Sequence, residues 1–348
     1  MAVKFTKPEI NVREKLAELD KPSGIAGEAM LRAETPQEQQ ALIGVGRRNL
    51  IINGDFYVSQ RGDYTSATTI TNGTYYLDRC ISYAGNVGGT VQDMGGSIKH
   101  TATNSTIGYL GLEQRIEDYS RLGGETITVS AEVKSNHSSA QITIYDSAYR
   151  DGVHHSGGGG WEKLTHTFTV NTSLSRLWIQ VWIADSASSL NATITSGDYI
   201  EVRNLQVERG KIATPFEHRS YGEELALCER YYQKSYDKDA YVTGSTSLSS
   251  VGSVDHYGSS DATNVLAQVY FRTQMRDAPT VTTYDPNSSN GGNAYAGRAY
   301  VVSNSGTASY NTTTNNISST GFRSYVPKNG ASWAGHRLLF QWQAVAEL

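Results

Sequence analysis

The 348-residue sequence predicts a mainly β protein: short N-terminal helices, a jelly-roll β-sandwich, a short linking helix and a C-terminal β-rich tip domain. Three observations lead to this fold class. Hydrophobic residues (38%) and charged residues (18%) are both scarce, whereas 34 Gly and 22 Tyr are present. Several segments alternate apolar and polar residues with a period of two, as half-buried antiparallel strands do. Clusters of Gly, Asn and Ser separate these segments, as turns do in sandwiches.

Residues 1–47 differ in composition and are expected to form a helical attachment segment. They are rich in Glu, Lys, Arg, Gln and Ala, which favour helices. Thr35-Pro36-Gln37-Glu38 has the order of a capping box, with Thr at the N-cap and Pro at the first helical position. Because such short helices are not stable alone, we expect them to dock onto copies of this chain or onto another protein.

Residues 48–218 carry the clearest strand patterns and are expected to form the jelly-roll sandwich. In residues 126–134, apolar side chains at every second position share one face and polar side chains share the other. Residues 164–170 repeat this alternation. One face of each such strand is therefore expected to lie in a core between two sheets.

Residues 219–236 are expected to form a helix that links two β regions. Ser220-Tyr221-Gly222-Glu223 is a second capping box. Leu225, Cys228 and Tyr232 then follow on one apolar stripe at heptad-like spacing. We expect this stripe to lie on the axis of a homotrimer.

Residues 237–348 are expected to form a β-rich tip domain that ends in a strand over 338–346. Apolar residues are so scarce here that a monomer would bury a poor core, and oligomerisation would supply the missing burial. Four tyrosines in segments rich in Asn, Ser and Gly are candidates for an adaptable binding surface, or alternatively for packing between subunits: Tyr284, Tyr295, Tyr300 and Tyr310.

Composition and motifs exclude several function classes. The net charge of −4 provides no basic field for nucleic acid, and no apolar run approaches the ~18 residues of a membrane span. Cys80 and Cys228 are expected to be reduced and buried, as in a protein made in the cytoplasm; one long-range disulfide between them stays open as the alternative. No zinc, nucleotide or nucleophile motif is present, so we expect no cofactor and no catalytic residue; a structural Ca²⁺ held by loop carboxylates stays open.

The strand over 177–183 carries the candidate binding residues. Its aliphatic residues face one way, whereas Trp178, Gln180 and Trp182 face the other, about 6.5–7 Å apart along the strand. Indole rings stack on the C–H face of a sugar ring, and an amide hydrogen-bonds its hydroxyls. This face is therefore either a carbohydrate-binding platform or a face covered by a loop or a second subunit.

Two stretches of the sequence resemble the beginning and the end of a module common in bacteriophage tail fibre proteins. The first is RNLIINGDF (48–56) followed by SQRG (59–62); the second is NLQVERG (204–210), ATPFE (213–217) and EELALCERYY (223–232). Together they bracket about 185 residues, roughly half of the chain. The module is similar to jelly-roll carbohydrate-binding modules. One departure is Cys80, which follows Asp78-Arg79 where the family usually has Trp.

The resemblance implies a non-enzymatic virion protein, made in the host cytoplasm, that acts as a trimeric tail fibre recognising host-surface polysaccharide. Residues 1–47 would bind a tail adaptor or nozzle protein. No nucleic-acid partner and no membrane insertion are expected. Two alternatives remain: a fibre-borne polysaccharide depolymerase, and an architectural tail or collar component without receptor binding.

Overall fold

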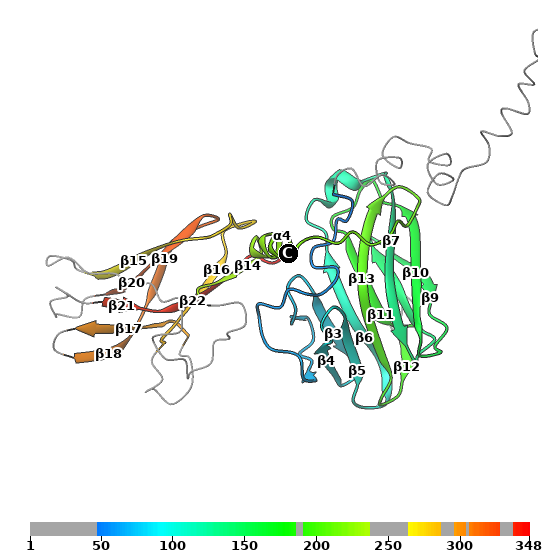
Figure 1. Ribbon diagram of the computed structural model, residues 1–348, viewed down its shortest axis with the longest axis horizontal. Helices are drawn as coiled ribbons and strands as arrows, with labels where there is room; N and C mark the ends of the chain where they lie inside the picture. Colours follow the sequence, from blue (N-terminus) through cyan, green and yellow to red (C-terminus); the bar gives the residue numbers. More distant parts are fainter. Residues whose placement is uncertain (1–46, 186–190, 237–263, 287–295, 304–305, 328–336) are drawn as a thin grey trace, which may run out of the picture.

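The computed structural model describes residues 47–185, 191–236, 264–286, 296–303, 306–327 and 337–348. Within these ranges the chain is mainly β, with one α-helix and one 3-10 helix, which confirms the predicted fold class. The helices expected near the N-terminus lie outside the described residues. Figure 1 shows one group of strands, blue to green, on one side of the helix α4 (Tyr221–Glu229), and the C-terminal strands, yellow to red, on the other.

Thirteen strands between Thr68 and Arg209 form two antiparallel sheets. The first, here called the front sheet, has the order β2 (Thr74–Tyr75), β3 (Ile81–Gly85), β6 (Thr106–Arg115), β11 (Trp178–Ile183), β8 (Ala140–Tyr145) and β9 (Tyr149–His154), with β12 (Ala192–Ile194) paired to β6. The second, the back sheet, has the order β1 (Thr68–Thr69), β4 (Gly89–Asp93), β5 (Ile98–Ala102), β13 (Tyr199–Arg209), β7 (Thr126–Ser135) and β10 (Trp161–Thr169). The 3-10 helix η1 (Tyr119–Leu122) connects β6 to β7.

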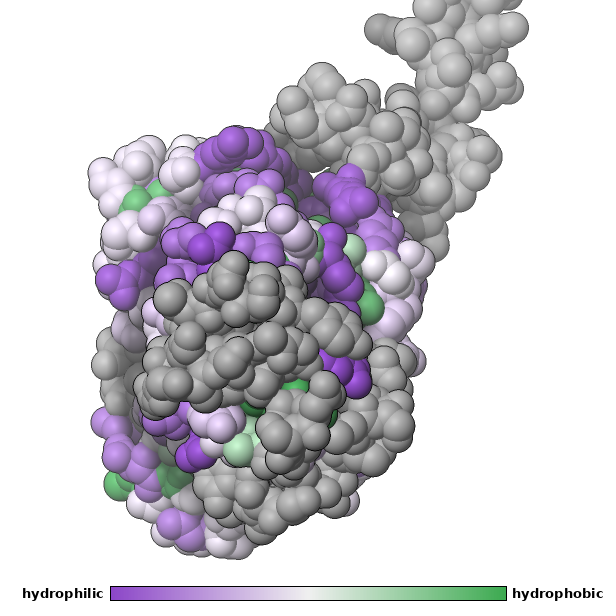
Figure 2. Space-filling model, turned by 90° about the vertical axis from the view of Figure 1, so that its left-hand side faces the viewer, coloured by the Kyte–Doolittle hydropathy of each residue, from purple (hydrophilic) through white to green (hydrophobic). Residues whose placement is uncertain are grey.

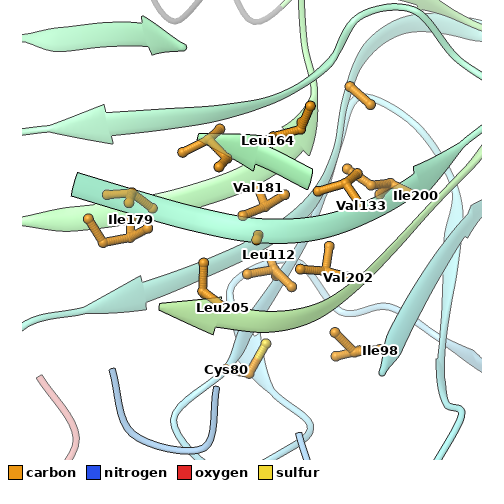
Figure 3. Packing of buried hydrophobic residues seen from close by; sticks show 14 of the residues in the cluster. Cys80, Ile98, Leu112, Val133, Leu164, Ile179, Val181, Ile200, Val202 and Leu205 are labelled. Carbon is orange, nitrogen blue, oxygen red and sulfur yellow. The ribbon is translucent and has the colours of Figure 1, made fainter. Parts of the chain in front are cut away.

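The core of this sandwich lies between the two sheets. Figure 3 shows Leu112 and Val181 of the front sheet meeting Val133 and Val202 of the back sheet, and all four are fully buried. The alternation in residues 126–134 is confirmed, because all its apolar side chains face this core. Cys80 packs into the same cluster as a free, fully buried thiol, which agrees with the reduced and buried state expected for it.

The linking helix is shorter than predicted. The hydroxyl of Ser220 caps α4 by accepting the backbone N–H of Glu223, as the capping box predicted, but the helix ends at Glu229. The chain then enters the strand β14 (Tyr232–Lys234), which pairs with β22 (Gln341–Val345). Strand pairing therefore replaces the helical turn that would have placed Tyr232 on one stripe with Leu225 and Cys228.

The C-terminal region contains three small antiparallel sheets. Their orders are β14–β22–β16 (Thr280–Tyr284), β15 (Asn264–Tyr270)–β20 (Gly321–Pro327)–β19 (Thr313–Ser318), and β18 (Gly306–Asn311)–β17 (Arg298–Ser303)–β21 (Arg337–Leu339). Among the described residues their core is much smaller than that of the sandwich and centres on Phe322, Phe340 and Trp342. The strand predicted over 338–346 is divided at Phe340 into β21 and β22, which belong to different sheets, but Leu338, Phe340, Trp342 and Ala344 all contribute to this core as expected.

Buried charges join the end of the chain to the sandwich. The Glu347 carboxylate forms ion pairs with Arg61 and Arg79, and the Arg79 side chain is 2% exposed. Arg115 donates a hydrogen bond to the backbone oxygen of Leu348. These contacts, here called the joint, lie beside α4, where Figure 1 marks the C-terminus.

The contacts around the joint contradict part of the prediction that Leu225, Cys228 and Tyr232 lie on a trimer axis. Cys228 is fully buried, and Tyr232 is 4% exposed with the Arg61 guanidinium 4.2 Å from its ring centroid. Both side chains therefore fill space within the chain and are not available to a neighbouring copy. Leu225 is half-buried. The stoichiometry itself stays a prediction.

Candidate functional site

The candidate binding residues lie on the outer face of the front sheet, opposite the core. Cross-strand pairing arranges the side chains of this face in rows, because directly opposed residues point the same way. The rows are Arg115, Trp178, Tyr145 and Tyr149; then Glu113, Gln180, Thr143 and Asp151; then Tyr83, Gly111, Trp182 and Gln141. We call this surface the aromatic face, after its rings: Tyr83, Tyr109, Tyr145, Tyr149, Trp178 and Trp182.

The first row provides a continuous ladder of rings. The half-buried Trp178 stacks on Tyr145 with ring centroids 5.1 Å apart and an interplanar angle of 30°. Tyr145 in turn meets Tyr149 edge to face at 4.8 Å, and Tyr149 is 40% exposed. The ladder therefore runs from a partly buried indole to an exposed phenol at the edge strand β9.

The second row is polar; Glu113, Gln180 and Thr143 are buried, whereas Asp151 on the edge strand is exposed. Gln180 donates its amide N–H to one oxygen of Glu113, and Arg115 donates to the other, both at 2.8 Å. The residues Glu113 and Gln180 are 1% and 2% exposed. These bonds hold the Arg115 guanidinium next to the ring ladder, 5.0 Å from the Trp178 ring centroid.

Trp182 does not belong to an exposed platform, which corrects the prediction for this residue. It is 2% exposed, its indole N–H donates to the Thr143 hydroxyl at 3.0 Å, and the Tyr109 ring meets it at 5.5 Å. Opposite it, a side chain on Gly111 would lie 2.6 Å from the Trp182 Cβ. The alternative of a covered face therefore holds for Trp182 and Gln180, and the cover includes the chain's own tyrosine.

The three tip candidates within the described residues lie on strands and not in loops. Tyr284 ends β16 and is half-buried, Tyr300 in β17 is 9% exposed, and Tyr310 in β18 packs against the C-terminal core. Tyr295 lies outside the described residues. Figure 2 views this end of the molecule and shows mostly hydrophilic or neutral residues on the described surface, with small hydrophobic patches. These tyrosines therefore do not form the exposed loop cluster that the sequence suggested.

Other chemistry is sparse in the part of the chain that is described. No group of three or more His, Cys, Asp or Glu side chains there is arranged to hold a metal ion, and no helix there is long and apolar enough to cross a membrane. Burial raises the pKa of both thiols, Cys80 and Cys228, well above the usual range. A cavity of about 220 Å³ beside the joint is bordered by Arg79, Arg115 and Tyr231.

Comparisons with known proteins give distant structural similarities. No protein-family profile matches this chain, and no curated protein matches its sequence. Among solved structures it is similar to a CBM4 module, at 16% identity over 45% of this chain and 98% of that one, with a TM-score of 0.29. It is also similar to the CBM22-1 xylan-binding domain from Paenibacillus barcinonensis Xyn10C, at 17% identity over 44% and 99%, with a TM-score of 0.27.

A third similar structure comes from a phage. This is the enzymatically active domain of tailspike protein 4 of bacteriophage CBA120, at 16% identity over 47% of this chain and 21% of that one, with a TM-score of 0.27.

Proposed function

We propose that this protein binds glycans through the aromatic face and does so as the receptor-binding part of a bacteriophage tail fibre. The observation that carries the binding proposal is the ring ladder of Trp178, Tyr145 and Tyr149 beside hydrogen-bonding side chains. Aromatic rings pack against the apolar face of a sugar, while nearby polar groups bond its hydroxyls.

The Arg115 side chain favours binding because it is already ordered. Its bond to Glu113, which also accepts from the buried Gln180, orients the Arg115 guanidinium before any ligand arrives. A ligand that meets such a surface loses little side-chain entropy of the protein on binding. Binding requires no catalytic step, and we propose none.

The virion role rests on the sequence stretches at 48–62 and 204–232 that resemble tail fibre modules. We propose that residues 1–47 bind a tail adaptor or nozzle protein and that three copies assemble in each fibre. Several weak sites on one virion raise avidity by about 10²–10⁴-fold. Such a gain would let a protein with low affinity for each site hold a virion on a repetitive polysaccharide.

Glycan binding is tested with a glycan array and two ring-ladder variants, Trp178→Ala and Tyr149→Ala. Both variants should lose most of the binding that the wild type shows, while thermal melting confirms that they fold. Tyr270→Ala is the matched control, because Tyr270 is 78% exposed on β15 in the C-terminal region. Undiminished binding by both ladder variants would rule out this face.

The same protein separates the alternatives. Measuring the size of host polysaccharide after incubation with the protein tests for a depolymerase. A depolymerase would shorten the polysaccharide chains, whereas our proposal expects their length to stay the same. Unchanged host-cell adsorption by Trp178→Ala virions favours an architectural role. Light scattering tests the homotrimer, and a monomer at micromolar concentration contradicts it.

A further inference from the structure

Arg176 lies at the aromatic face, on the segment that leads into β11. It precedes Trp178 by two residues, so the two side chains are expected on the same side of the chain. The Arg176 Cζ lies 4.8 Å from the Trp178 ring centroid and 5.9 Å from that of Tyr145. The residue is exposed. A cation is therefore held beside the stacked pair of rings, at the Trp178 end of the ladder.

Arg176 differs from Arg115, the other arginine near Trp178, in having no acidic partner among the described residues. Arg115 is bound to Glu113. Across the described ranges, no ion pair or hydrogen bond involves the Arg176 guanidinium. Its contacts with the two rings are cation–π contacts, which leave its N–H groups without protein acceptors among these residues. The positive charge at this end of the face is therefore not neutralised by a carboxylate.

A guanidinium in this position matches a carboxylate on a sugar. Its planar fork of N–H donors binds both oxygens of a carboxylate at once, and such charge-assisted bonds are about twice as strong as neutral ones. A sugar ring packed on the ladder would bring a substituent at its edge to the Arg176 donors.

We propose that the glycan bound at the aromatic face carries a carboxylate, as in a uronic acid, and that Arg176 binds this group. The inference rests on the proposed function, because it names the class of glycan recognised at the same site. Arg176 is then the residue that distinguishes acidic from neutral sugars, while the rings supply affinity for both.

The experiment uses the full chain and a panel of alginate, polygalacturonate, hyaluronan, a sulfated carrageenan and neutral xylan. Each bound uronate polymer is then compared with its carboxyl-reduced form, in which the uronate has become a neutral sugar. We expect the intact polymer to bind about 10-fold or more tightly than the reduced one. Arg176→Gln should abolish this preference, and Arg176→Lys should keep part of it because a point charge remains.

Arg209→Gln is the matched control. It removes the same charge at an exposed site of the back sheet, where Arg209 pairs with Glu125. The inference is overturned if intact and reduced polymers bind equally, if Arg176→Gln keeps the preference, or if the sulfated polymer binds best. If neutral xylan binds and Trp178→Ala abolishes that binding, the proposed function stands while the role of Arg176 fails. Absence of binding to every member of the panel overturns both.

Discussion

Two tryptophans of one strand show how neighbours decide what a residue does. Trp178 and Trp182 both point to the outer face of β11, yet the first stacks at the accessible ladder and the second is enclosed. This difference in exposure arises from the residues on the neighbouring strands that lie opposite each indole ring. Gly111 lies across from Trp182 and leaves room for its indole to lie close to the sheet, whereas Arg115 and Tyr145 flank Trp178.

We therefore predict opposite effects for the two alanine variants. Trp182→Ala should lower the free energy of unfolding by about 3–5 kcal/mol, because it leaves a cavity and an unpaired Thr143 hydroxyl. Trp178→Ala should cost clearly less stability but remove glycan binding. Urea denaturation measures the first effect, and equal stability losses in the two variants would contradict this assignment.

A buried histidine in the sandwich predicts a pH dependence. His100 is fully buried, its Nε2 lies 2.8 Å from the Ser82 hydroxyl, and burial lowers its pKa to about 3. Because the unfolded chain binds the proton at a higher pH, near 6.5, this residue reduces the free energy of unfolding as the pH falls from about 6.5 towards 3. The reduction approaches about 1.4 kcal/mol per pH unit.

His100→Gln should flatten this dependence, since Gln can still bond Ser82 but does not titrate. Denaturation curves at pH 7, 6, 5 and 4 measure the difference between the variant and the wild type. That difference should change with pH in favour of the variant. Parallel curves for the two proteins would show that His100 is not held neutral.

At the scale of elements, α4 shows competition between a helix and a strand. The local sequence from Ser220 favours a helix, and its capped start is found where expected. Its end is set from a distance, because Tyr232 to Lys234 pair with residues 343–345, more than 100 positions away. The backbone hydrogen bonds between β14 and β22 satisfy the N–H and C=O groups that a longer helix would otherwise pair.

The helix cap supplies a prediction for this element. Ser220→Ala removes the acceptor for the Glu223 N–H and should lower the free energy of unfolding by about 1 kcal/mol. Ser220→Asp restores an acceptor and should recover most of that loss. Thermal or chemical denaturation of the two variants provides the measurement, and an Ala variant as stable as the wild type would exclude a contribution from the cap.

At the scale of the whole molecule, the joint ties the sandwich to the C-terminal region through few charges. Glu347→Gln should lower the free energy of unfolding by about 3 kcal/mol or more, because the buried Arg79 loses its carboxylate partner. Calorimetry of this variant should also show the sandwich and the C-terminal region unfolding less cooperatively with each other than in the wild type. Glu125→Gln, which breaks the exposed pair with Arg209, is the control and should cost less than about 1 kcal/mol.

Much of the fold followed from local pattern, but the candidate site did not. Alternation placed Trp178, Gln180 and Trp182 on one face because strand geometry fixes that direction. Glu113 was missed, although it holds Gln180, since the two are 67 residues apart in sequence. No local signal gives the register that brings them together. Arg176 was missed for a related reason, as its role appears only when Tyr145 of another strand stacks on Trp178.

The sequence by itself determined that this chain is mainly β, which residues of its clearly alternating segments face the core, and where α4 begins. These features depend on side-chain spacing and on contacts a few residues apart. Only the tertiary structure decided which strands pair, where α4 ends, and which rings stay accessible. These depend on contacts between distant segments, because burial and hydrogen bonding at each position are set by whatever side chain lies opposite.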